Sequence, residues 1–156
     1  YFIEQAKNGL IPITDLNMTR FNITITQAVE FVLNVLKNSL GGEIFVPKLP
    51  SYRIKDVADA IGPNCEHKII GVRDGEKIHE EMITFSDSPS TIDLGNRYAI
   101  LPPDGELLKK YEKEDIDFKR VPKGFSYNSL NNHKFFNKQE IRKLIVDNLD
   151  AKFLPN

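Results

Sequence analysis

The 156-residue sequence predicts an α/β fold of mixed short strands and helices. Residues 26–39 repeat apolar side chains at helical spacing, whereas residues 91–101 show the alternation and the glycine-containing turn of a β-hairpin. Over residues 26–72 the signals follow the order helix, strand, helix, strand, which favours an α/β unit. The length suits one domain or one lobe of a larger protein, and we expect a single domain over residues 1–156.

The first residues have the pattern of the C-terminal end of an amphipathic helix. Phe2, Ile3 and Ala6 fall on one side, and a glycine follows as a typical helix stop. A chain that opens inside a helix indicates a cut from a longer protein, although a mature or tag-cleaved terminus would look the same. After this helix we expect residues 11–14 to be extended, because Pro12 is tolerated in an edge strand or a loop.

A strand and the longest helix come next. Residues 19–25 alternate apolar and polar side chains with the period of a strand. Thr24 and Gln27 then fit a capping box, which predicts that the helix over residues 26–39 starts there. Without a covering element, the apolar face of this helix is expected to be exposed, which invites self-association.

Shorter elements and a polar segment follow. We expect a strand over residues 43–46, a helix over residues 54–61 and a buried strand over residues 68–72. The polar segment 73–77 separates them from the hairpin.

The last third of the chain divides into two segments. Residues 102–126 are charge-rich and carry three prolines, so we expect a surface excursion with a short helix near Leu107 to Tyr111. Residues 127–156 form a C-terminal segment whose final helix is capped by Asn137 and carries an apolar stripe.

The charge balance and composition exclude several classes of partner. Lys and Arg number 21 against 22 Asp and Glu, a formal net charge of −1, so we expect no nucleic-acid partner. No apolar run approaches the roughly 18–20 residues that span a bilayer, so we expect no membrane contact. The single cysteine, Cys65, excludes an intrachain disulfide and fits a reducing compartment, so we expect a cytoplasmic protein.

The sequence contains no catalytic or cofactor-binding motif. Its nine glycines never form the Gly-x-Gly-x-x-Gly fingerprint of a dinucleotide site, and none of its five tyrosines is followed four places later by lysine. We therefore expect no catalytic residue and no cofactor bound by this chain.

Metal binding has little support. Cys65 and His67 lack a second pair with zinc spacing, and Glu76-x-x-His79 is only half of a carboxylate-bridged dimetal signature. We expect no metal site, a structural role for His79, and surface positions for His67 and His133.

Two arginines indicate anion recognition. Arg20 and Arg73 lie in loop-like contexts, and a guanidinium matches two phosphate oxygens at once. Glu76, close after Arg73, suits two vicinal ribose hydroxyls. The pattern hints at a diphosphate and a sugar, but spacing alone favours the alternative that the two arginines pair with Asp15 and Asp74 on the surface.

Four blocks resemble one family. Residues 18–21, 41–48, 73–80 and 121–129 read Met-Thr-Arg-Phe, Gly-Gly-Glu-Ile-Phe-Val-Pro-Lys, Arg-Asp-Gly-Glu-Lys-Ile-His-Glu and Val-Pro-Lys-Gly-Phe-Ser-Tyr-Asn-Ser. In this order they resemble the inverting UDP-N-acetylglucosamine 4,6-dehydratases of the extended short-chain dehydrogenase/reductase group. Four linked blocks are far more specific than any one of them.

The resemblance implies an architecture. In this family an N-terminal Rossmann domain binds NADP and carries the catalytic Asp, Lys and Tyr, and a C-terminal lobe binds the substrate. The blocks match this C-terminal substrate-binding lobe, so the Rossmann domain is expected upstream of Tyr1 and is absent from this chain. NADP is then a cofactor of the parent enzyme. The implied partners are a UDP-sugar, the missing Rossmann domain and further copies in a homo-oligomer.

The resemblance also assigns a substrate site. It consists of Pro12, Ile13, Thr14, Thr19, Arg20, Arg73 and Glu76. By resemblance, Arg20 and Arg73 hold the diphosphate region and Glu76 holds the ribose. Residues 12–14 match the stretch whose backbone lies beside the uracil.

The implied function is the UDP-N-acetylglucosamine-binding part of a 4,6-dehydratase, an NADP-dependent lyase that serves surface polysaccharide or flagellin-glycan precursor synthesis. This part is expected to bind and orient the substrate, and to be inactive alone. One alternative is a stand-alone nucleotide-sugar binding or assembly module. Another is the same lobe from a related UDP-sugar epimerase.

Overall fold

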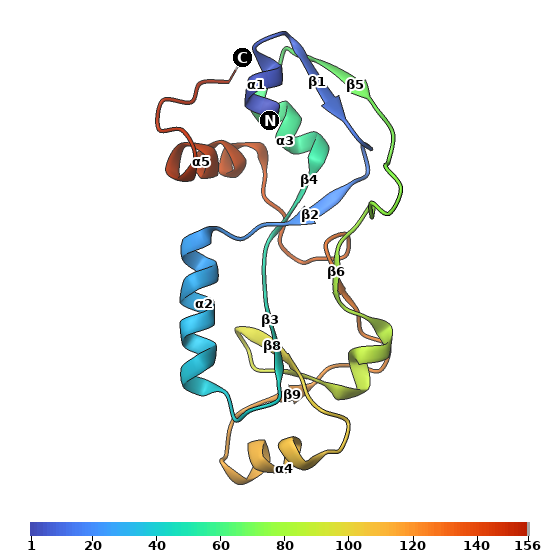
Figure 1. Cartoon of the computed structure of the whole chain (residues 1–156), viewed down its shortest axis with the longest axis vertical. Coiled ribbons are helices and arrows are strands. Elements are labelled where there is room, and N and C mark those ends of the chain that lie inside the picture. Colours follow the sequence, from blue (N-terminus) through green and yellow to red (C-terminus); the bar gives the residue numbers. More distant parts are fainter. Residues whose placement is uncertain (156) are drawn as a thin grey trace. The chain divides into compact units, whose positions relative to one another are not determined.

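The computed structural model describes residues 1–155, which form two compact units (Figure 1). Unit 1 combines Tyr1–Asn22, Pro50–Glu80 and the described part of Ser129–Asn156. Unit 2 combines Ile23–Leu49 and Glu81–Asn128. Each unit is therefore assembled from segments that lie far apart in the sequence.

Unit 1 contains helices and two small sheets. Its helices are α1 (Phe2–Ala6), α3 (Ile54–Ile61) and α5 (Lys138–Asn148), and its strands are β1 (Leu10–Ile13), β2 (Thr19–Phe21), β4 (Ser51–Arg53) and β5 (Glu66–Ile69). Strands β1 and β5 pair in parallel, and β2 and β4 pair antiparallel. The apolar core of this unit consists of Ala6, Ile11, Ile13, Ala58, Ala60, Ile61, Ile141, Ile145 and Phe153.

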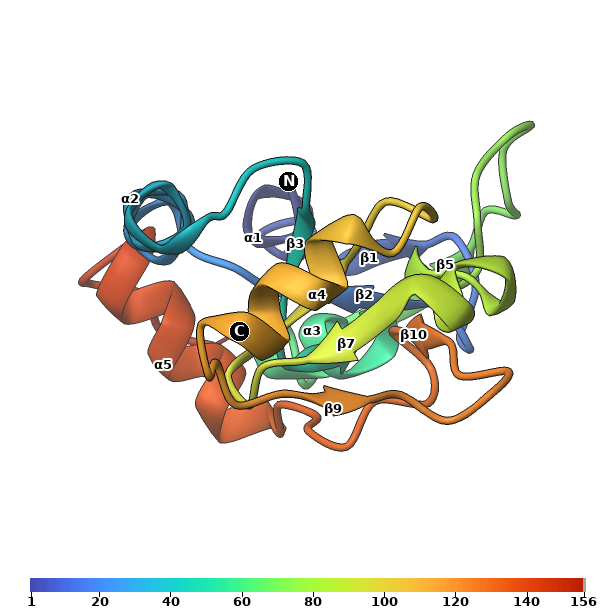
Figure 2. The ribbon, with the colours of Figure 1, turned by 90° about the horizontal axis from the view of Figure 1, so that it is seen from below.

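Unit 2 is built on antiparallel strands. Its elements are the helices α2 (Ile25–Asn38) and α4 (Glu106–Lys113), the 3₁₀ helix η1 (Phe85–Ser90), and the strands β3 (Ile44–Pro47), β6 (Glu81–Ile83), β7 (Thr91–Asp93), β8 (Arg97–Ile100), β9 (Lys119–Arg120) and β10 (Tyr127–Asn128). Four strands form one sheet in the order β3-β8-β7-β9, and β10 pairs with β6. The helix α4, drawn in orange in Figure 2, buries Leu107 and Tyr111 in one apolar cluster with Ile92 of β7.

These elements confirm the predicted α/β class of mixed short strands and helices. The hairpin expected over residues 91–101 is formed by β7 and β8. The capping boxes expected at Thr24 and Asn137 both form, and they start α2 and α5. Local signals therefore placed these elements to within a residue or two.

Two strand predictions need correction. The strand expected over residues 19–25 ends at Phe21, because Thr24 caps α2 and Ile25 is already helical. The segment expected to be a buried strand forms β5 only as far as Ile69, and Ile69 is 52% exposed. Within the described chain β5 pairs only with β1, and three of its four residues are exposed, so neighbouring elements leave this edge strand largely uncovered.

The expected segments 102–126 and 127–156 stay predictions, and each contains regular elements. Residues 102–126, expected to be a surface excursion, include α4 and β9, and α4 anchors the segment through its two buried side chains. The C-terminal segment 127–156 contains β10 and the final helix α5. The single domain expected over residues 1–156 stays a prediction.

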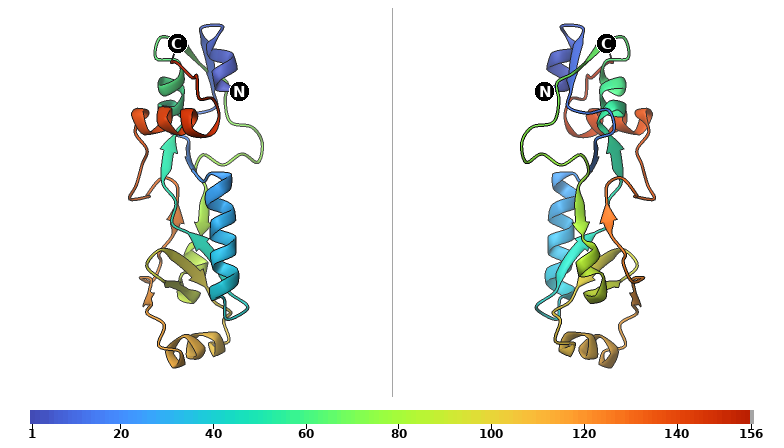
Figure 3. Two further views of the ribbon diagram at one scale, coloured as in Figure 1. Left: turned by 90° about the vertical axis from the view of Figure 1, so that its left-hand side faces the viewer. Right: turned by 90° about the vertical axis from the view of Figure 1, so that its right-hand side faces the viewer.

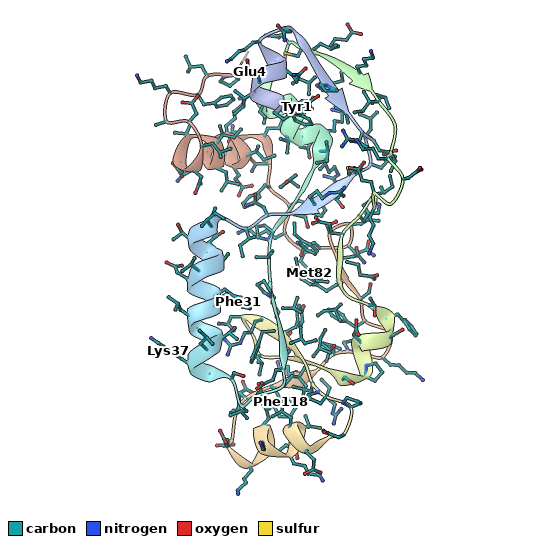
Figure 4. All side chains as sticks on the ribbon, viewed as in Figure 1. Tyr1, Glu4, Phe31, Lys37, Met82 and Phe118 are labelled. Atoms are coloured by element: carbon teal, nitrogen blue, oxygen red, sulfur yellow. The ribbon has the colours of Figure 1, made fainter. Side chains whose placement is uncertain are left out.

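Helix α2 leaves its apolar face uncovered, as expected. None of its residues is buried, and the most exposed apolar side chains are Ile25, Val29, Val32, Leu33 and Leu36. The helix runs alongside the strands of unit 2 (Figure 3), where Arg97 Nη1 donates to Asn34 Oδ1 at 2.9 Å. Figure 4 shows Phe31 on the side of α2 that faces these strands and Lys37 on an outer side.

Candidate functional site

Strand β2 presents its three residues to two different faces. Thr19 and Phe21 are buried, whereas Arg20 between them is only partly covered. This alternation follows from the pleat of a strand, which points successive side chains in opposite directions. Arg20 lies in register with Tyr52 of β4, and because residues paired directly across two strands project to the same face, both side chains emerge on one face of the β2–β4 pair.

The guanidinium of Arg20 is held on one side and left accessible on another. Its Nη1 donates to the carbonyl oxygens of Thr19 at 2.8 Å and Ile78 at 3.0 Å. Its Nη2 lies 3.7 Å from Glu76 Oε1, and its Nε lies 3.8 Å from Glu80 Oε1. These last two distances are too long for hydrogen bonds. Nε and Nη2 therefore face carboxylates without hydrogen bonding to them, and they are the nitrogens of this guanidinium that remain able to bind an anion.

Arg20 does not form the surface pair that spacing alone favoured. Its side chain is 18% exposed, and the carboxylates beside it belong to Glu76 and Glu80 rather than to Asp15. Both glutamates come from a segment far along the chain, which spacing around Arg20 does not reveal.

Arg73 and Glu76 form a tight turn in the loop after β5. The Glu76 N–H donates to the Arg73 carbonyl at 3.0 Å, and the Arg73 N–H donates to Glu76 Oε2 at 3.3 Å. Gly75 adopts a φ of 80°, a left-handed conformation that side chains disfavour. The turn places the Glu76 carboxylate next to Arg20, while the Arg73 residue itself is exposed.

Residues 12–14 lie at the end of the β1–β5 pair that leads into this turn. Because the two strands are parallel, Thr14 after β1 and Ile70 after β5 meet at the same edge. The Ile13 side chain is fully buried, and its carbonyl accepts the Ile70 N–H at 2.9 Å. Pro12 has no N–H to donate. Within residues 1–155, no hydrogen bond or ion pair is found between this stretch and Arg20.

Thr19 is 1% exposed and takes part in a buried network. Its Oγ1 lies 2.6 Å from Ser129 Oγ and 2.9 Å from His79 Nδ1. Ser129 Oγ in turn accepts the Glu80 N–H at 2.9 Å. The structural role expected for His79 fits this contact. A direct ligand contact of Thr19 stays a prediction.

Three residues at the site, Glu80, Ser129 and Tyr52, have no binding role among the sequence predictions. Glu80 and Ser129 belong to the recognised blocks 73–80 and 121–129, but nothing in their spacing reveals that they meet. Tyr52 lies outside all four blocks. Burial raises the pKa of Tyr52, the charge of Glu80 raises it further, and Arg20 offsets part of the effect. The phenol beside Arg20 is therefore neutral at physiological pH.

Other candidate ligand residues lie apart from this cluster. The His67 side chain, expected on the surface, is only 20% exposed, and its Nε2 lies 3.6 Å from Asp59 Oδ1. Across residues 1–155, no three His, Cys, Asp or Glu side chains gather in a metal-binding arrangement. No helix in the same range has both the length and the apolar character to cross a membrane.

Residues 1–102 match the model of a protein family described as "Polysaccharide biosynthesis protein". The chain is 44% identical over 144 residues to a UDP-N-acetylglucosamine 4,6-dehydratase (inverting) from Campylobacter jejuni, which covers 86% of this chain and 42% of that protein. It is 36% identical over 155 residues to a UDP-glucose 4-epimerase from Rickettsia felis, which covers 96% of this chain and 44% of that protein.

A solved structure shares the fold. The X-ray structure of Pen from Bacillus thuringiensis superposes with a TM-score of 0.76 at 30% identity, over 98% of this chain and 45% of that chain. The chain thus spans somewhat less than half the length of the relatives that it matches.

Proposed function

Because the chain belongs to the polysaccharide biosynthesis protein family and matches the C-terminal part of inverting UDP-N-acetylglucosamine 4,6-dehydratases, we propose that it binds the UDP-sugar for such an enzyme. The main support is that Arg20 and Glu76, from segments far apart in the sequence, lie 3.7 Å apart next to the Arg73 turn. This combination suits a diphosphate next to a ribose, because the cation pairs with phosphate oxygens and the carboxylate accepts hydrogen bonds from hydroxyls.

Each side chain has a role in the proposal. The Nη2 of Arg20 takes a diphosphate oxygen, and the exposed Arg73 supplies a second cation. Glu76 accepts hydrogen bonds from the two ribose hydroxyls. A phosphate and the Glu76 carboxylate cannot both occupy the space beside Nη2, so Glu76 must turn from Arg20 towards the ribose when the ligand binds.

The stretch 12–14 is proposed to read the uracil through its backbone. The Ile13 carbonyl is already used by Ile70, and Pro12 has no N–H. Thr14, half-buried and directly after β1, is therefore the residue whose backbone N–H and carbonyl suit a uracil edge.

We assign the chemical steps of the whole enzyme to residues outside this chain. NADP supplies hydride chemistry in this family, but the residues of this chain do not fit it, because no glycine-rich turn joins a strand to a helix as a dinucleotide requires. We propose that this chain binds and orients the sugar, is inactive alone, and works with a Rossmann domain in a cytoplasmic homo-oligomer.

A UDP-sugar epimerase is the second candidate. Its support is the 36% identity to the Rickettsia felis UDP-glucose 4-epimerase over nearly the whole chain. Both enzymes would use this lobe in the same way, since both act on a sugar attached to UDP. Product analysis of the complete enzyme with UDP-N-acetylglucosamine separates the two candidates. A dehydratase releases water from the sugar, whereas an epimerase inverts the configuration of a carbon that carries a hydroxyl.

Calorimetric titration of UDP into the chain tests the binding site. Arg20→Ala and Glu76→Ala should each weaken UDP binding about tenfold or more, because each removes charge-assisted hydrogen bonds. Arg120→Ala, an exposed arginine of β9 in unit 2, is the matched control and should bind UDP as the unaltered chain does. If the unaltered chain releases no more heat than the Arg20 and Glu76 variants, the site assignment is wrong.

A further inference from the structure

We propose that Glu80 is a positioning residue that orients the guanidinium of Arg20 for the diphosphate. The inference rests on the proposed function and gives a role to a glutamate that the substrate assignment leaves out. Two carboxylates flank Arg20 at nearly equal distances, 3.7 Å for Glu76 and 3.8 Å for Glu80. They differ in how firmly each is held, and this difference separates their roles.

Glu80 is fixed at three points. Its N–H donates to Ser129 Oγ at 2.9 Å, and its carbonyl accepts the Ser129 N–H at 2.8 Å. Its carboxylate Oε2 accepts the N–H of Phe21 at 2.8 Å. Phe21 directly follows Arg20 in β2, so the carboxylate that faces Arg20 Nε is tied to the strand that carries Arg20. Glu80 cannot move from Arg20 without breaking this short bond.

A buried hydrogen-bond chain fixes the backbone around Glu80. Ser129 Oγ accepts the Glu80 N–H, so its own hydrogen is available to donate to Thr19 Oγ1, which lies 2.6 Å away. The Thr19 hydroxyl can then donate to His79 Nδ1 at 2.9 Å. This assignment uses each hydroxyl hydrogen once. The Thr19 N–H also donates to the Ile78 carbonyl at 3.0 Å, so residues 78–80 are held next to β2 by hydrogen bonds.

The hydrogen bonds between residues 78–80 and β2 determine where the Arg20 guanidinium points. Nη1 donates to the carbonyls of Thr19 and Ile78, and Nε faces the Glu80 carboxylate. The remaining nitrogen, Nη2, faces Glu76. Arg20 is therefore held by groups that belong to the folded framework, and Nη2 is the atom whose partner can be exchanged.

Glu76 is held more weakly. The only N–H that its carboxylate accepts within the described chain is that of Arg73, at 3.3 Å in an exposed turn. A diphosphate oxygen that binds Nη2 has to take the place of the Glu76 carboxylate, whose Oε1 lies 3.7 Å from that nitrogen. The firmer anchoring of Glu80 makes Glu76 the carboxylate that leaves and Glu80 the one that stays.

Proton exchange at the Arg20 Nε–H, followed by NMR, tests the positioning role without any ligand. Glu80→Gln should retain an oxygen for Phe21 but lose the charge facing Nε, and exchange at this hydrogen should become several times faster. Glu76→Gln should leave the exchange rate unchanged, because Glu76 faces Nη2. Glu81→Gln, an exposed glutamate at the next position, is the matched control. Unchanged exchange in Glu80→Gln overturns the proposal.

Titration of UDP into the same variants connects the positioning role to binding. Glu80→Gln should weaken UDP binding about fivefold, the usual scale of a partly exposed ion pair. If the unaltered chain does not bind UDP, the proposed function fails while the exchange result still decides the role of Glu80. Should Glu80→Gln not fold, Glu80→Asp keeps the charge at a shorter reach, and its Arg20 exchange rate should also exceed that of the unaltered chain. An unchanged rate there overturns the proposal as well.

Discussion

The buried serine and threonine hydroxyls of unit 1 and unit 2 donate to different kinds of partners. In unit 1, Thr19 and Ser129 bond to each other across 110 positions of sequence. Ser51, which is fully buried, accepts from the Asn132 amide 81 positions away. In unit 2, the hydroxyls of Ser88 and Thr91 donate to carbonyls only three and four positions back. The serine and threonine hydroxyls of unit 1 thus join distant side chains, whereas those of unit 2 donate within one turn. Distant segments of unit 2 are joined instead by the hydroxyls of Tyr111, which donates to Glu43, and Tyr127, which donates to the Leu49 carbonyl, and by the Gly124 N–H, which donates to Ser88 Oγ.

This difference bears on where a site can form. All seven substrate-binding residues predicted by resemblance lie in unit 1, in the segments Tyr1–Asn22 and Pro50–Glu80. The third segment contributes Ser129, which ties Glu80 to Thr19. The geometry around Arg20 therefore depends on how three segments pack together. A substitution that disturbs this packing should change the geometry of the site even when it alters no residue that contacts the ligand.

The largest effect expected is the loss of a fully buried isoleucine in either unit. Ile13 in unit 1 and Ile92 in unit 2 are 0% and 1% exposed. Replacing either by alanine should lower the free energy of unfolding by about 2–5 kcal/mol, because it leaves a cavity. Hydrogen exchange read by mass spectrometry should show lost protection mainly in the unit that carries the substitution. Equal loss over both units would contradict the division of the chain into two units.

Buried threonines offer a matched pair at a smaller scale. Thr19→Val removes the hydroxyl that links Ser129 and His79, and should lower the free energy of unfolding by about 1–3 kcal/mol, because buried groups lose their partners. Thr91→Val removes one local bond to the Asp87 carbonyl and should cost about 0.5–1.5 kcal/mol. Urea unfolding measures both, and UDP titration should show a loss of affinity for Thr19→Val alone. A larger cost for Thr91→Val would reverse the comparison.

The sequence predicted what depends on neighbouring residues. The capping boxes at Thr24 and Asn137 start their helices where expected, because each box closes within four residues. The hairpin of β7 and β8 likewise depends on one turn. The exposed apolar face of α2 was also expected, since the helix period is readable from the sequence.

Contacts between distant segments were not predictable in the same way. Spacing favoured a pair between Arg20 and Asp15, but the carboxylates beside Arg20 are Glu76 and Glu80. Burial of β5 was overestimated for the same reason, since it depends on which distant segments pack over the faces of the strand. The resemblance named Arg20 and Glu76 as one site. Neither it nor the spacing identified the Thr19–Ser129 bond that organises the neighbourhood.

A carboxylate in each unit should make both units sensitive to acid. Burial raises the pKa of Asp59 in unit 1, but hydrogen bonds from Lys138 and Lys55 outweigh it and hold this pKa below its ordinary value. Burial also raises the pKa of Glu43 in unit 2, where bonds from backbone N–H groups, Ser39 and Tyr111 outweigh it. A pKa lowered by folding stabilises the fold above the ordinary pKa, and this stability is lost as the pH falls through the folded-state pKa.

Urea unfolding at several pH values measures this acid sensitivity. Stability should fall between about pH 5 and about pH 3, and Asp59→Asn or Glu43→Gln should each reduce the slope in that range. The substitution should act on the unit that carries it, as hydrogen exchange at about pH 4 can report. If both variants keep the full slope, other carboxylates cause the acid sensitivity.

The smallest effect is expected from apolar side chains that neither unit covers. Leu36 of α2 and Leu149 at the end of α5 are 72% and 77% exposed. Leu36→Ala and Leu149→Ala should each change the free energy of unfolding by no more than about 0.5 kcal/mol, because little apolar surface is lost from a buried site. The two substitutions should give the same result, since the units differ in their buried polar contacts rather than in their exposed surface. A cost above about 1 kcal/mol for Leu36→Ala alone, with a urea midpoint that rises with protein concentration, would mean that another copy of the chain covers α2 in solution.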